Sequence, residues 1–368
     1  METTVAEGTA TESPSRPGAT SPDSAPGPVD RPPIGRGRFS SRLSALAVLA
    51  VLVIAVAVLS LLVGSGDITA AQAWHALWTG NDGSTTAEII WTTRIPRTIL
   101  GIVVGAALGV AGAVIQAMTR NPLADPGILG VNAGAYFFMV VGFSILGATS
   151  TSENVLFALV GSFLAAILVY FVGSRGRGGA APAKLVLTGV AVGCVFTGVA
   201  FGMTMVDPKA FDSIRAWQVG SLQKDHGGEI LGTVWPYIAV GIVIAIALTG
   251  YLNAIGLGDD RARSLGVPVT TVRAFGFVSM TLLCGAATAA IGPVTFLGLM
   301  IPQLVRMVVG PDQRWIIPAS ALCAPIVFVA ADVVGRVVTP TELPVGMVTA
   351  FIGAPALIIL VRRKGVAL

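Results

Sequence analysis

Long stretches without Asp, Glu, Lys or Arg alternate with short charged connectors along this chain. A membrane-crossing helix needs about 20 apolar residues. The stretch 274–305 holds Gly292-Pro293 near its middle, which predicts two helices joined by a tight turn. The other stretches predict one helix each: 43–66, 98–119, 126–152, 154–174, 185–206, 230–258, 315–331 and 343–361. The pattern therefore predicts an all-α polytopic membrane protein with ten transmembrane helices.

The first 42 residues differ from the rest of the chain. They are rich in Pro, Ser, Gly and Thr and show no apolar periodicity, so we expect residues 1–42 to be a disordered cytoplasmic tail. The first apolar run starts too late and is too long for a signal peptide, which favours an uncleaved first span. One transmembrane domain is expected over residues 43–364.

Composition supports the bilayer as the solvent. Of the 368 residues, 54% are hydrophobic and 11% are charged, whereas a soluble domain carries about 25% charged residues. This composition argues against a soluble enzyme, a nucleic-acid binder or a secreted scaffold.

Lys and Arg are unevenly divided between the two sides of the predicted bundle. With the N-terminus inside, 17 of the 23 fall in cytoplasmic segments, and ten spans return the C-terminus, with Arg362, Arg363 and Lys364, to that side. Both termini are therefore expected to be cytoplasmic. The membrane topology explains the net charge of +4, so a nucleic-acid partner is not needed to account for it.

Charged residues gather at the outer ends of two predicted helices. Arg94 and Arg97 flank Pro96 before the second helix. Asp332 and Arg336 stand four residues apart at the outer end of the ninth span, where they can pair on one helix face. Arginine makes bidentate contacts with carboxylates, so an acidic partner can dock on such cations. Anchoring of the helix ends explains them equally well, and both interpretations stay open here.

The inner loop 256–272 mixes charged and apolar residues. It predicts one or two short surface helices, with Gly266 supplying a positive φ between them. The loop is either a solvated connector or a docking element for a cytoplasmic protein, and its candidate coupling residues are Asp259, Asp260, Arg261, Arg263, Leu265 and Gly266.

Two further patterns concern packing. Small residues recur every four positions at Gly101, Gly105, Gly109, Ala113 and Ala117, which places them on one helix face where another helix can approach closely. Gln116, on the same helix, is expected to make an interhelical hydrogen bond. The following connector, 120–126, contains two N-cap–proline pairs and predicts a rigid, sharply turned loop.

Several chemistries find no support in the sequence. No Gly-Lys dipeptide occurs, so there is no P-loop, and no metal-ligand cluster or hydrolytic triad can be drawn. Cys194, Cys284 and Cys323 lie in separate apolar runs and are expected to be small core residues. We expect no cofactor, no metal and no enzymatic activity, and energy for any transport from another chain.

Long motifs stand in order along nearly the whole chain. They include Arg-Ile-Pro-Arg at 94–97, the run 105–116, Arg-Asn-Pro-Leu-Ala-Asp-Pro-Gly-Ile-Leu-Gly at 120–130, and the runs 259–266, 292–303, 312–314, 332–336, 342–346 and 353–355. Together they resemble the FecCD-type permease family of iron–siderophore, haem and cobalamin ABC importers. The run 121–135 is most similar to the ferric enterobactin type. Gln303 and Gln313 depart from the family, which often has His at these positions.

The resemblance implies a type II ABC importer permease fold with ten helices. It also implies a function: translocation of a ferric siderophore across the cytoplasmic membrane, driven by a separate ATPase. The partners implied are a dimer of cytoplasmic ATP-binding subunits, an extracytoplasmic siderophore-binding lipoprotein, and a second permease copy or paralogue, with membrane lipid around them.

The resemblance also assigns roles to particular residues. It implies that Arg94, Arg97 and Arg336 receive acidic residues of the binding protein, and that the loop 259–266 contacts the ATPase. A haem or cobalamin permease of the same family is the alternative. An ion-coupled secondary transporter would need a charge at the centre of an apolar stretch, and a membrane enzyme would need paired acid–base residues beside a nucleophile or a metal. The sequence offers neither.

Overall fold

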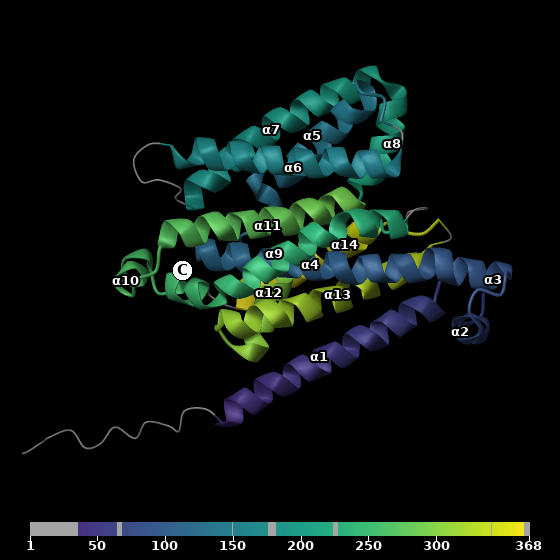
Figure 1. Ribbon diagram of the computed structural model, residues 1–368, viewed down its shortest axis with the longest axis horizontal. Helices are drawn as coiled ribbons and strands as arrows, with labels where there is room; N and C mark the ends of the chain where they lie inside the picture. The colour runs from purple at the N-terminus through teal and green to yellow at the C-terminus, as the bar shows by residue number, and fades with distance from the viewer. Residues whose placement is uncertain are drawn as a thin grey trace, which may run out of the picture.

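The computed structural model describes residues 36–64, 68–148, 150–175, 182–223, 227–339 and 341–363. Within these ranges all regular secondary structure is helical (Figure 1). A π turn (Ile89–Arg94) leads into α4, and a 3-10 turn (Pro126–Leu129) precedes α5. The helices are α1 (Arg36–Leu62), α2 (Ala70–Thr79), α3 (Thr85–Glu88), α4 (Ile95–Thr119), α5 (Val131–Ser144), α6 (Thr151–Ser174), α7 (Pro182–Val206), α8 (Pro208–Gln218), α9 (Gly227–Gly256), α10 (Asp259–Ser264), α11 (Val269–Ile291), α12 (Leu297–Val309), α13 (Gln313–Val338) and α14 (Val345–Arg363).

The helices confirm the predicted all-α polytopic membrane protein. In the described ranges, seven helical segments are long and apolar enough to cross a membrane, and three shorter apolar helices lie at Val131–Ser144, Leu297–Val309 and Val345–Ile359. The break expected at Gly292-Pro293 is present, because α11 ends at Ile291 and Gly292 takes φ 89°. The stretch 274–305 corresponds to α11 and α12, and each other predicted apolar stretch corresponds to one helix.

The structure differs from the sequence prediction at the start of the first span. Helix α1 begins at Arg36, so residues 36–42 continue the first span as helix; residues 1–35 lie outside the described ranges. Arginine has high helix propensity, which favours extending the helix beyond its apolar core. Helix α13 runs to Val338 and includes Asp332 and Arg336, which pair on one helix face as expected. The amphipathic helices α2 and α8 were not predicted, because the charge-free stretch that contains α2 is too short to cross a membrane and α8 carries charged residues.

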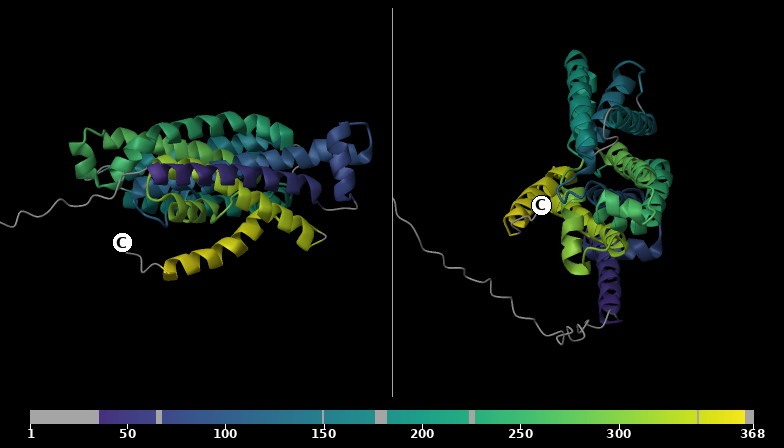
Figure 2. Two further views of the ribbon diagram at one scale, coloured as in Figure 1. Left: turned by 90° about the horizontal axis from the view of Figure 1, so that it is seen from below. Right: turned by 90° about the vertical axis from the view of Figure 1, so that its left-hand side faces the viewer.

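The two ends of the bundle carry different elements. Helix α10 lies at one end and α2 and α3 lie at the other (Figure 1). Helix α1 begins, and α14 ends, toward the end that holds α10 (Figure 2). We refer to the α10 end as the inner end and to the α2 end as the outer end.

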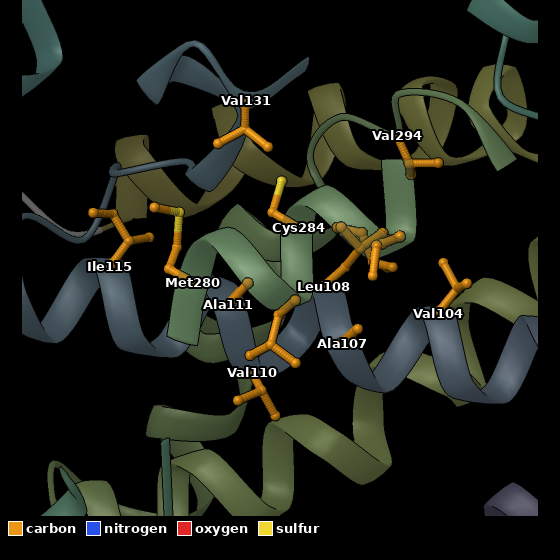
Figure 3. Close-up of a cluster of buried hydrophobic side chains, with 14 of the residues drawn as sticks. Val104, Ala107, Leu108, Val110, Ala111, Ile115, Val131, Met280, Cys284 and Val294 are labelled. Carbon is orange, nitrogen blue, oxygen red and sulfur yellow. The ribbon is translucent and has the colours of Figure 1, made fainter. Parts of the chain in front are cut away.

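Helix α4 forms the centre of the protein. It packs against α9, α11, α12 and α13, and 78% of its most apolar window is buried, against 6% for α1. Figure 3 shows Val104, Leu108 and Ile115 of α4 in one apolar cluster with Met280 and Cys284 of α11. A second group, α5 to α8, joins this core where α6 packs on α11.

The predicted small-residue face of α4 packs against α13. A Cβ atom built on Gly105 would lie 2.9 Å from the Cα of Pro325, and one on Gly101 would lie 3.1 Å from the Cγ2 of Val329. The two backbones therefore approach as closely as the missing side chains permit, which confirms the packing predicted from the four-residue spacing.

Replacement of Gly105 by Ala should destabilise the protein. The added methyl group meets backbone atoms of Pro325, which cannot move away by a side-chain rotation. We therefore expect the free energy of unfolding to fall by about 1–3 kcal/mol. Gly232→Ala, on α9, is the matched control because nothing lies within 4 Å of its added Cβ. Thermal unfolding in detergent compares the two; equal midpoints would contradict the close contact between α4 and α13.

Candidate functional site

A cavity of about 860 Å³ lies among α5, α7 and α8. It is lined by Gly127, Gly130, Asn132, Ala133, Tyr136, Gly189, Val190, Gly193, Cys194, Thr197, Gly198, Phe201, Trp217, Gln218 and Pro293. Small-ligand sites in proteins typically measure about 300–1,000 Å³. The cavity is therefore large enough for a bulky organic molecule.

The cavity wall is uncharged. Its lining residues include no Asp, Glu, Lys or Arg, and Tyr136, Phe201 and Trp217 supply aromatic surface. Small residues on one face of α7, among them Gly189 and Gly193, keep the space open. A wall of this kind offers many weak contacts and no strong fixed partner, which suits passage of a ligand better than its retention.

Cys194 corrects the expectation that all three cysteines belong to the core. Its side chain is exposed and lines the cavity, whereas Cys284 is buried and Cys323 is partly buried. The missed signal is the spacing of Gly189, Gly193 and Thr197 on α7, which marks one helix face as sparsely filled. Cys194 follows Gly193 and lies beside that face, and both residues line the cavity.

The connector 120–126 joins the inner end of α4 to the cavity. Asp125 caps the 3-10 turn, because its Oδ1 accepts a hydrogen bond from the Gly127 N–H at 2.8 Å. Burial raises the pKa of the Asp125 carboxyl, and the bond from Gly127 opposes that shift. Gly127 and Gly130, just beyond, form part of the cavity wall. The rigid loop predicted from the sequence therefore borders the candidate site.

Two glutamines hold this connector against α12. Gln303 Nε2 donates to Gln116 Oε1 at 2.8 Å and to the Pro122 carbonyl at 3.0 Å, and Gln116 Nε2 donates to the Leu299 carbonyl at 3.0 Å. This confirms the interhelical role predicted for Gln116. Gln303 takes part in the same network.

At the outer end, one buried carboxylate binds two arginines. Asp332 is 1% exposed. Arg97 Nη2 donates to Asp332 Oδ1 at 2.7 Å, and Arg336 Nε donates to Asp332 Oδ2 at 2.9 Å. Arg97 Nη1 also donates to Glu342 Oε2 at 2.8 Å. This cluster joins α4, α13 and the segment that precedes α14.

The same region caps the end of α1. Arg336 Nη1 donates to the Ser60 carbonyl at 2.9 Å, and Arg94 Nη1 donates to the Leu61 carbonyl at 2.9 Å. The last carbonyls of a helix have no partner within that helix. Two arginines from other helices therefore satisfy them and fasten α1, which is otherwise little buried, to the core.

The structure thus brings Arg94, Arg97 and Arg336 together, as buried side chains with partners inside the chain. Their expected contact with a binding protein stays a prediction. Among the outer cations, Arg215 on α8 is exposed and stands beside a polar pocket lined in part by Asp212 and Glu342.

At the inner end, α10 confirms one of the short surface helices expected in the loop 256–272. Gly266 follows it with φ 78°, the positive value expected for that position. Arg261 and Leu265 are exposed, as are the side chains of Asp260 and Arg263, which form a local ion pair at 3.2 Å. Asp259, by contrast, points to other helices.

No group of three or more His, Cys, Asp or Glu side chains within the described ranges is placed to hold a metal ion. The charged clusters at the two ends consist of arginine–carboxylate ion pairs, which hold helices together. The large cavity, the buried outer cluster and α10 are therefore the features to compare with known proteins.

The comparisons agree with one another. The profile of the FecCD transport family matches residues 52–363. The ferric enterobactin transport system permease protein FepD of Escherichia coli (strain K12) is 42% identical over 88% of this chain and 96% of its own. The probable siderophore transport system permease protein YfiZ of Bacillus subtilis (strain 168) is 36% identical over 89% and 98%. An inward-facing metal-chelate type ABC transporter superposes with a TM-score of 0.77 at 26% identity, over 88% of this chain and 100% of that one.

Removal of the Asp332 charge should weaken the fold severely. In Asp332→Asn the guanidinium groups of Arg97 and Arg336 stay buried without their carboxylate, and breaking a buried ion pair from one side costs about 3–5 kcal/mol. Asp260→Asn is the matched control, because the Asp260 side chain is 99% exposed. The measurement is the unfolding midpoint in detergent, and similar losses for both variants would show that the outer cluster does not stabilise the bundle.

Proposed function

The chain belongs to the FecCD transport family, and we propose that it is the membrane permease of an ABC importer that carries a ferric siderophore across the cytoplasmic membrane. The identity to a ferric enterobactin permease over almost the whole chain supports this cargo. The uncharged cavity among α5, α7 and α8 is the observation that supports a pathway for a bulky chelate. The chain is a transport subunit and not itself an enzyme.

The proposed topology has ten spans, a type II importer permease fold and cytoplasmic termini. Seven long and three shorter apolar helices in the described ranges supply the spans. The excess of Lys and Arg in the segments that ten spans place inside supports the orientation. Helix α10 then faces the cytoplasm, and α2 and α8 face the outside.

Three partners follow from this orientation. A dimer of ATP-binding subunits supplies the energy and contacts the exposed side chains of Asp260 and Arg263 on α10 and of Leu265 directly after it. A siderophore-binding lipoprotein delivers the chelate at the outer end, where Arg94, Arg97 and Arg336 are the residues proposed to receive its acidic side chains. A second permease copy or paralogue lies beside the cavity, where only 17% of the most apolar window of α7 is buried within one chain.

Two other functions fit the observations less well. A haem or cobalamin permease of the same family would share this fold, and the similarity to siderophore permeases favours iron chelates. An ion-coupled carrier needs a charge along its ion pathway. The charges buried within α4 and α13 instead lie near the outer end and are paired with one another, and the cavity wall holds none.

Uptake by whole cells tests the cargo and the energy source. A deletion strain complemented with this chain should take up labelled ferric siderophores, and uptake should stop when the partner ATPase is inactivated. It should survive collapse of the proton gradient. Labelled haem and cobalamin are the comparison ligands; uptake of either in preference to every siderophore would assign a different cargo, and dependence on the gradient alone would contradict an ABC importer.

Cys194 gives a direct test of the cavity as the pathway. A bulky thiol reagent should react with this exposed side chain and reduce uptake by an order of magnitude, because the adduct fills space that the chelate needs. Cys194→Ala should transport normally and resist the reagent, which excludes effects through Cys284 or Cys323. Full uptake by labelled wild-type protein would place the pathway elsewhere.

A further inference from the structure

A groove of about 310 Å³ lies between α6 and α11. One wall is a face of α6 from Phe163 to Ser174, and the other is a face of α11 from Ala274 to Thr281. Its lining holds no Asp, Glu, Lys or Arg, and its polar side-chain groups are the hydroxyls of Tyr170, Ser174 and Thr281. It shares no lining residue with the larger cavity among α5, α7 and α8.

The groove opens to the membrane. Ile167 and Phe171 on the α6 wall and Val278 on the α11 wall are exposed within this chain. Both helices are long and apolar enough to cross a membrane. Lipid hydrocarbon is therefore the medium that these side chains meet.

The length of the groove matches the depth of one leaflet. From Phe163 to Ser174, at a rise of 1.5 Å per residue, α6 advances by roughly 16 Å, and half of a hydrocarbon core of about 30 Å is about 15 Å. Ser174 is the last residue of α6 and lies toward the inner end. At the other end of the groove, Phe163 lies against Tyr237 of α9, with ring centroids 6.4 Å apart. The groove thus runs from the inner surface to about the middle of the bilayer.

A cation stands at the inner mouth of the groove. Arg175, the C-cap of α6, is exposed, and its guanidinium carbon lies 3.9 Å from the centroid of the Phe171 ring in the groove wall. Among the described residues, no carboxylate forms an ion pair with Arg175. A cation–π contact holds the guanidinium in place and leaves its N–H donors free for an anion. Arginine binds phosphate through two such donors at once.

These features fit a phospholipid better than a protein segment. Basic sites between membrane helices on the cytoplasmic side bind anionic head groups, and an apolar groove one leaflet deep accepts an acyl chain. A helix about 10 Å wide and of the same length occupies on the order of 1,000 Å³. It therefore cannot enter a groove of about 310 Å³.

We propose that the groove between α6 and α11 binds an anionic phospholipid of the cytoplasmic leaflet, with an acyl chain along Ile167 and Val278 and the phosphate at Arg175. The α5–α8 group joins the core where α6 packs on α11. The bound lipid lies along this junction and holds the two groups of helices together. The inference goes beyond the proposed function and takes from it only the orientation of the inner end.

The first test measures lipid binding to the full chain after removal of lipid in detergent. Phosphatidylglycerol and phosphatidylcholine with identical acyl chains are titrated, and bound lipid is counted by native mass spectrometry. We expect one tightly bound phosphatidylglycerol per chain and weaker binding of phosphatidylcholine. Arg175→Gln should lower affinity for phosphatidylglycerol about fivefold, the effect of one arginine on an anionic lipid, and leave phosphatidylcholine unchanged. Arg314→Gln, which removes an exposed arginine at the start of α13, is the matched control.

The second test fills the groove. Ala274 is partly exposed and lines the groove, so the indole ring of Ala274→Trp should occupy the space of the acyl chain and reduce binding of both lipids. Val243→Trp, at an exposed position of α9, is the matched control. Phosphatidylglycerol should raise the unfolding midpoint of the wild type and of Val243→Trp, but not of Ala274→Trp, because a ligand that binds only the folded state stabilises it. If Ala274→Trp does not fold, the Arg175→Gln comparison still decides.

Four results would overturn the inference. They are equal affinity of the wild type for the two lipids, unchanged phosphatidylglycerol binding in Arg175→Gln or in folded Ala274→Trp, displacement of the lipid by glycerol 3-phosphate, and cross-linking of two chains through the cysteine of Ile167→Cys. Displacement would show that the acyl chain does not contribute, and cross-linking would show that a second copy covers the groove. None of these measurements uses ATP, a binding protein or a chelate, so failure here and failure of the proposed function are distinguishable.

Discussion

Close approach of helices around α4 is the constraint on which the rest of the structure depends. In a bilayer, burying apolar side chains between helices gains little, because lipid tails are equally apolar, so dense packing and polar contacts must supply the cohesion. The glycines of α4 bring its backbone against α13, where even one added methyl group at Gly105 would meet Pro325. This central packing sets the positions of both ends of α4, and each end carries a charged cluster.

The two clusters use the same chemistry in different surroundings. At the outer end, Asp332 is 1% exposed and holds Arg97 and Arg336 between α4, α13 and the end of α1. At the inner end, the Asp259 side chain is 23% exposed and holds Arg120 and Arg273. Breaking a buried ion pair strongly destabilises the folded protein, whereas rearranging a partly hydrated pair costs less free energy. The outer pair is therefore costly to break, and the inner pair is less so.

The cavity lies between these ends and contains neither charge nor tight packing. Glycines on α7 and in the connector after α4 form its wall, and aromatic side chains supply its contacts. A bulky chelate needs space and weak contacts rather than a tight binding site, because a transporter must also release what it binds. The connector that forms one side of the cavity wall begins at Arg120. One continuous segment of the chain therefore contributes to both the cavity wall and the inner cluster.

Much of the fold followed from the sequence. Hydrophobic runs located the spans, Gly292-Pro293 located the break between α11 and α12, and spacing of small residues located the packing face of α4. These features depend on neighbours within one helix, which a linear pattern records directly. The amphipathic helix α2 was missed because its charge-free stretch is too short to cross a membrane, and α8 was missed because it carries charged residues. The burial of Arg97 was missed as well, since its partner Asp332 lies 235 residues away, and so was the exposure of Cys194 in an apolar run. Whether a charge is buried and paired, or a cysteine faces a cavity, is decided by contacts between distant segments, and only the tertiary structure brings those segments together.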